Sequence, residues 1–159
     1  MGLTIKCKKT GRSIDMSYSG FFRLRNKVAE LAGSPFAEHY ATLAAGSRLC
    51  GKDRTEFFER FDKRTLEYIR TKSVSAKVVD FLLQSDCDGK IHYGACKVLL
   101  RYIGDYDDDV LYGYAGRPDC AKFADFKAIL QDCVQNECDM VWYALDSVDC
   151  LQCVCFVSV

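Results

Sequence analysis

The chain has 159 residues, a length typical of one domain with a single hydrophobic core. Lys plus Arg and Asp plus Glu number 22 each, so the net charge is near zero. This balance argues against a dedicated nucleic-acid binder, which carries a basic excess, and against an acidic mimic of DNA. The sequence has no apolar run of the roughly 18 residues that a membrane span needs, and residues 1–7 lack the apolar core of a signal peptide. We therefore expect one cytoplasmic domain over 1–159, with no membrane partner, no nucleic-acid partner and mostly reduced cysteines.

The predicted elements begin with two short strands, 3–7 and 13–18, joined by a basic turn in which Gly11 can take a positive φ. A helix over about 19–32 follows, because four apolar residues recur at the spacing of a buried stripe. These residues are Phe21, Leu24, Val28 and Leu31. Periodicity and caps predict further helices over about 34–45, 54–70, 92–103 and 118–135, and one that is capped by Ser73 or Ser75 and ends near residue 84.

The end of the chain reads as β structure. Residues 140–145 have the composition of a strand and include the only tryptophan, and the apolar tail 146–159 is expected to form another strand or a tail. With strands at both ends and helices between them, the sequence predicts an α+β protein that is mostly helical. About six helices would pack on a small antiparallel sheet formed by the N- and C-terminal strands.

The segment 105–120 has the most unusual composition. Four carboxylates occupy the five positions 105–109, and two tyrosines, two glycines and an Arg-Pro-Asp step follow. Three interpretations compete: helix capping by some of the aspartates, a protein-binding surface, and a carboxylate site for Mg²⁺ or Mn²⁺ in phosphoryl chemistry. The binding surface would comprise Asp107, Asp108, Asp109, Tyr112, Tyr114 and Arg117.

A second unusual string, 13–25, carries the candidate binding residues Tyr18, Arg23 and Arg25. The two arginines lie about 200° apart on a helix, so they do not form one clamp. We expect one of them to form an ion pair with the acidic run at 105–109, which would explain both charge clusters as one intramolecular contact.

Metal and nucleophile motifs are incomplete. Residues 86–91 resemble the middle of an EF-hand loop, but Ala95 stands where the bidentate glutamate is needed, so a turn at Gly89 between two helices is preferred. Cys150, Cys153 and Cys155, with Cys133 and Cys138 upstream, offer thiolates for zinc, although an apolar cysteine-rich strand is the favoured interpretation. No cofactor and no catalytic residue are predicted. Of the two histidines, His39 is expected to be structural or on the surface, and His92 lies near Cys87 and Cys96, which would matter for nucleophilic catalysis only if the fold brings them together.

The strings SIDMSYSGFFRLR, VVDFLLQSDCDGKI and IGDYDDDVLYGYAGRPDCAKFADF resemble a group of small proteins that we associate with Gram-positive bacteria, their phages and their mobile elements. The resemblance covers about 12–142 and leaves out the cysteine-rich tail, and no residue role follows from it. It implies a context in which small proteins without enzyme motifs bind and block a host protein. The favoured function is therefore stoichiometric binding of a host defence protein. The alternatives are sequestration of a small molecule or nucleotide and a metal-dependent enzyme acting on a phosphate ester.

Overall fold

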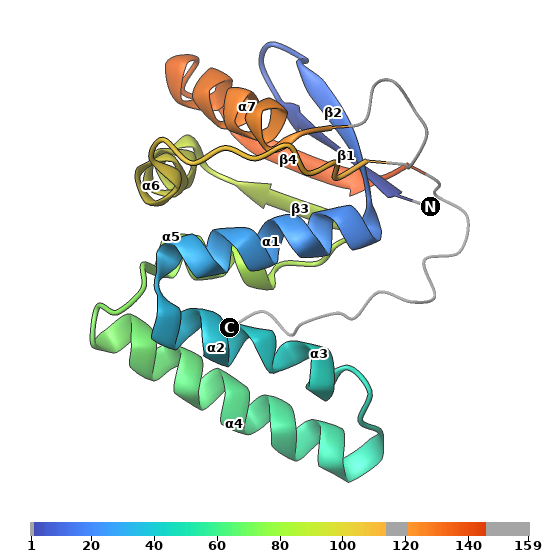
Figure 1. The fold of residues 1–159 in the computed structure, drawn as a ribbon, viewed down its shortest axis with the longest axis vertical. Helices are drawn as coiled ribbons and strands as arrows, with labels where there is room; N and C mark the ends of the chain where they lie inside the picture. The colour runs from blue at the N-terminus through green and yellow to red at the C-terminus, as the bar shows by residue number, and fades with distance from the viewer. Residues whose placement is uncertain (1, 114–120, 146–159) are drawn as a thin grey trace.

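The computed structural model describes residues 2–113 and 121–145, which form an α+β fold, as the sequence predicts (Figure 1). The sheet contains β1 (Gly2–Cys7), β2 (Ser13–Ser17), β3 (Asp88–Ile91) and β4 (Met140–Ala144). The strand order is β2-β1-β4-β3, and each neighbouring pair is antiparallel. The N-terminal strands and the strand after the last helix therefore share one sheet, which confirms that part of the prediction.

Helices cover one face of this sheet. They are α1 (Tyr18–Ala32), α5 (Ala76–Leu83), α6 (Tyr93–Ile103) and α7 (Phe123–Gln135). Helices α1, α5 and α7 contact the strands, and α6 packs against α1 and α7. None of the helices in the described ranges is both long and apolar enough to cross a bilayer.

Trp142 of β4 is the largest side chain in the core and links the sheet to the helices. It is fully buried, and its ring centroid lies 5.8 Å from those of Phe21 and Phe81. Its indole N–H donates a hydrogen bond to the Ser85 carbonyl oxygen over 2.8 Å, so the one polar atom of the ring is satisfied inside the core.

A second helical layer lies beyond α1 and consists of α2 (Ser34–Ala41), α3 (Leu43–Gly46) and α4 (Gly51–Arg70). Figure 1 shows α4 at the opposite end of the molecule from the sheet. His39 connects α2 to α4, because its ring stacks on Phe61 at 4.2 Å and its Nε2 lies 2.9 Å from Thr65 Oγ1. This histidine is therefore part of the packing between helices.

Three predictions about elements need correction. The turn proposed at Gly89 is instead strand β3, which pairs with β4 and places Gly89 opposite Trp142. Only a glycine fits there, because a Cβ would lie 2.1 Å from the indole ring. The predicted helix over 34–45 is split into α2 and α3, and α7 begins at Phe123 instead of near 118. Pro118 and the tail 146–159 lie outside the described residues.

Candidate functional site

The loop after α6, residues 105–113, is called the acidic loop below, and Asp108 lies at its centre. The hydroxyl groups of Tyr106 and Tyr112 each donate a hydrogen bond to Asp108 Oδ2 over 2.8 Å. The backbone N–H of Val110 donates to Asp108 Oδ1 over 3.0 Å. Three donors thus converge on one carboxylate, so Asp108 organises the loop from within.

Tyr112 anchors this loop to the body of the protein. Its side chain is 2% exposed, its N–H donates to the Ala121 carbonyl oxygen over 2.8 Å, and its own carbonyl accepts the Ser17 N–H over 3.3 Å. Burial, reinforced by the carboxylate of Asp108, raises the pKa of the Tyr112 phenol. Helix α1 approaches so closely at Gly20 that a Cβ there would lie 1.7 Å from the Tyr112 carbonyl oxygen.

Arg23 reaches the acidic loop, but it does not form the expected ion pair. Its guanidinium donates to the carbonyl oxygen of Leu111 over 2.8 Å and lies over the Tyr112 ring, 5.7 Å from its centroid. Arg25 forms its ion pair with Asp86 instead. Within 2–113 and 121–145, no ion pair joins either arginine to the acidic loop. The prediction of such a pair was wrong, because backbone and ring contacts hold Arg23 and the core encloses Arg25.

Arg25 is buried among aromatic rings. Its side chain is 3% exposed, and its guanidinium carbon lies 4.1 Å from the Phe21 centroid, 5.5 Å from that of Phe81 and 5.6 Å from that of Trp142. It also donates to the Gln84 carbonyl oxygen over 3.0 Å. Burial lowers the pKa of the guanidinium, and Asp86 partly opposes this effect. Among the described residues, Nε and one terminal nitrogen of the guanidinium have no hydrogen-bond partner. Arg25 is therefore enclosed in the core and is not available as a surface anchor.

The remaining predicted binding residues are divided by their placement. Asp107 and Asp109 are exposed, as is Asp105, and so are their apolar neighbours Val110 and Leu111, at 40% and 48%. Tyr18 is half-buried at the start of α1, with its hydroxyl 3.7 Å from a cysteine sulfur. Tyr114 and Arg117 lie outside the described residues.

The EF-hand resemblance at 86–91 has a structural explanation. Asp86 is paired with Arg25, and the side-chain amide of Gln84 both donates to and accepts from the backbone of Lys90 over 2.9 Å. The Asp86 carboxylate is thus used in a contact with α1, and the Gln84 amide joins the end of α5 to β3. His92 has a similar local role, because its Nδ1 accepts the Gly94 N–H and caps α6.

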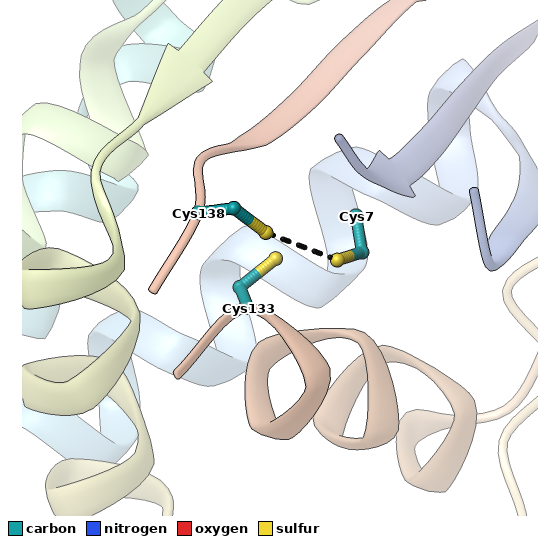
Figure 2. A group of neighbouring side chains, drawn as sticks. All are labelled: Cys7, Cys133 and Cys138. Carbon is teal, nitrogen blue, oxygen red and sulfur yellow. Dashed lines mark hydrogen bonds between the residues drawn. The ribbon is translucent and has the colours of Figure 1, made fainter. Parts of the chain in front are cut away.

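A second cluster was only half visible in the sequence. The sulfur atoms of Cys7, Cys133 and Cys138, here called the thiol cluster, all lie within 4.8 Å of one another (Figure 2). Cys7 and Cys133 are fully buried and Cys138 is half-buried. The Sγ atoms of Cys7 and Cys138 are 3.2 Å apart. Cys133 and Cys138 were candidate zinc ligands from the sequence, but Cys7, far away in the sequence, was not paired with them.

The three thiols are not electrostatically equivalent. Burial tends to raise the pKa of Cys7, but interactions with the Thr10 hydroxyl and N–H, the Cys138 thiol and the Lys9 N–H outweigh it and lower the pKa to about 7. The pKa of Cys138 is raised, chiefly by burial. The pKa of Cys133 is also raised, first by its contact with the thiol of Cys96 and then by burial. Cys7 therefore carries the most thiolate character in the cluster.

Comparison with known proteins adds no assignment to these features. No protein-family model, curated protein or solved structure matches the chain. The acidic loop and the thiol cluster must therefore be interpreted from their own geometry.

Proposed function

We propose that this protein acts by binding another protein stoichiometrically and that the acidic loop makes the central contact. The observation that carries this proposal is the arrangement of Asp105, Asp107 and Asp109 beside Val110 and Leu111. Three exposed carboxylates and two exposed apolar side chains occupy one short stretch. Such a surface suits a partner with a basic patch next to an apolar slot, because the charges steer the approach and the apolar groups add buried area.

The loop is fixed before any partner arrives. Within the loop, Asp108 accepts hydrogen bonds from the two tyrosine hydroxyls. Arg23 bonds the loop to α1, and the Tyr112 N–H bonds it to Ala121, just before α7. Binding by a fixed loop loses little conformational entropy, so more of the interaction energy is retained as affinity. The hydrogen bonds of Asp108 and Tyr112 therefore favour binding, because they hold the exposed residues of the loop in place.

For the partner we propose a host protein, and for the setting the cytoplasm of a Gram-positive cell carrying a phage or mobile element. Blocking of a defence protein is the specific form of this proposal. Its basis is the sequence resemblance together with a rigid surface that has no catalytic constellation. Nucleic acid is a poor partner for this loop, because exposed carboxylates repel phosphates.

The two alternative functions have less support. The carboxylates of the acidic loop do not converge: in the part of the chain that the structure describes, the thiol cluster is the one group of three ligand residues within 4.8 Å. Phosphoryl chemistry on this loop would lack its metal-binding centre. Sequestration of a small molecule would need an aromatic pocket, but the Tyr112 ring is buried in the core and its hydroxyl donates to Asp108.

The test combines capture with charge reversal. The tagged protein is crosslinked in lysate of a Gram-positive host, and the captured protein is purified and titrated by calorimetry at two salt concentrations. We expect the Asp105→Lys/Asp107→Lys/Asp109→Lys variant to lose about tenfold or more in affinity, with the larger loss at low salt. The matched control reverses three exposed carboxylates on α4, namely Asp53, Glu56 and Glu59. Equal affinity of the wild type and the loop variant would refute the proposal.

A further inference from the structure

The thiol cluster brings together segments from opposite ends of the chain. Cys7 is the last residue of β1, and antiparallel pairing places it opposite Met140, the first residue of β4. The chain reaches β4 through Cys138, so the register of the sheet brings the backbone of Cys138 close to that of Cys7. Figure 2 shows these two side chains pointing toward one another, with Cys133 pointing toward them from α7.

Cys133 and Cys138 are brought together by the way α7 ends. The Cys138 N–H donates to the Cys133 carbonyl over 3.0 Å, and the Glu137 N–H donates to the Val134 carbonyl over 3.4 Å, with Glu137 at a φ of 48°. These two bonds and the left-handed residue define a Schellman motif, in which the residues at the Cys133 and Cys138 positions normally make an apolar contact. Here both contact positions are thiols.

Backbone hydrogen bonds fix the segments that carry the cluster. The Lys8 N–H donates to the Asp139 carbonyl over 3.1 Å, and the Gly11 N–H donates to the Cys7 carbonyl over 3.0 Å. A cysteine that serves as a small core residue needs no second thiol beside it, whereas three sulfur atoms within 4.8 Å of one another are the ligand set that a thiophilic ion requires. Cys138 is half-buried, which leaves a way in from solvent.

We propose that Cys7, Cys133 and Cys138 bind one thiophilic metal ion, Zn²⁺ foremost, as three thiolates, with the fourth position open to solvent beside Cys138. Zn–S bonds of about 2.3 Å in tetrahedral geometry put the sulfur atoms about 3.8 Å apart. The Cys7–Cys138 pair at 3.2 Å must open slightly, and the other separations, all within 4.8 Å, must shorten by at most about one ångström. Each thiol that binds releases its proton to the buffer, and the complex carries one net negative charge.

The experiment uses the full, reduced chain and Zn²⁺ alone as the probe. Zn²⁺ is titrated against a chromophoric chelator, native mass spectrometry gives the stoichiometry, and Co²⁺ substitution provides a thiolate-to-cobalt charge-transfer band. We expect one ion per chain and a loss of about tenfold or more in affinity for Cys7→Ser and Cys138→Ser. Cys50→Ser, at an exposed cysteine outside the cluster, is the matched control and should bind as the wild type does.

Further variants keep the proposal falsifiable. Cys138→Ser changes a half-buried position, so its effect can be separated from misfolding by its melting temperature. A chain with Cys150, Cys153 and Cys155 all changed to serine should retain its ion. Loss of the ion in that chain and retention in Cys7→Ser would overturn the assignment. So would a reduced protein that binds no Zn²⁺ but forms a Cys7–Cys138 disulfide with hydrogen peroxide, which is itself reduced to water as the two thiols are oxidised.

Discussion

Replacing Asp108 by asparagine tests whether this residue holds the acidic loop together. The carboxylate accepts two tyrosine hydroxyls on Oδ2 and the Val110 N–H on Oδ1. An asparagine side chain has one oxygen, so either the hydroxyls or the N–H must face an NH₂ donor. A hydrogen bond to a charged group contributes about 1.5–3 kcal/mol, and partial exposure of Asp108 reduces this, so we expect the variant to lose about 2 kcal/mol of unfolding free energy.

The assay is urea denaturation followed by circular dichroism, with Asp109→Asn as the control. Asp109 is exposed, so its change should alter the unfolding free energy by no more than about 0.5 kcal/mol. Tyr112→Phe removes one of the three bonds and should cost about 1 kcal/mol. On that background Asp108→Asn should cost less than it does alone, because the two groups interact directly. Equal losses for Asp108→Asn and Asp109→Asn would refute the structural role of Asp108.

Three further predictions concern the body of the protein. Arg25→Ala should lower the unfolding free energy by about 3–5 kcal/mol. Arg25→Met should lower it by clearly less, because methionine still fills the space between the rings. Equal losses of the two variants in urea denaturation would contradict this. Gly20→Ala should lower the unfolding free energy by about 1–3 kcal/mol, because a Cβ at residue 20 would overlap the Tyr112 carbonyl oxygen. The neighbouring change Ser19→Ala should lower it much less. Burial lowers the pKa of His39 in the folded protein below its unfolded value of 6.5. The stability that the neutral ring contributes is therefore present above pH 6.5 and is lost as the pH falls through the folded pKa. In His39→Gln, the urea midpoint should change less between pH 7.5 and 5.5 than it does in the wild type.

The sequence predicted the elements with strong periodicity well and missed features that depend on contacts. Helix α1 followed from its apolar stripe, and the strand at 140–144 from its composition. Strand β3 was missed because four residues, Asp88–Ile91, show little alternation and include a glycine. What makes Gly89 fit a strand is the Trp142 ring across the ladder, and no local pattern contains that information.

The candidate sites show the same division. Arg25 was predicted as a binding residue, although it lies four residues after Phe21 and so shares the buried stripe. That spacing was a usable signal. The spacing of Cys133 and Cys138 was also a usable signal, since it matches the two contact positions of a Schellman motif. The pairing of Cys7 with them had no sequence signal, because it depends on the register between β1 and β4, and the expected pairing of the two ends of the chain does not set that register.

The sequence by itself determined the α+β class, the junction of the two β ends and the concentration of carboxylates at 105–109, because these follow from periodicity and composition. Only the tertiary structure decided which carboxylate faces inward, where each arginine is held and which cysteines meet. Asp108 is internal because two tyrosines on either side of it reach the same oxygen, whereas Asp107 accepts the backbone N–H of its neighbour Asp108 and stays exposed, as does Asp109. Such choices depend on the distances between atoms far apart in the chain, which packing sets and local sequence does not.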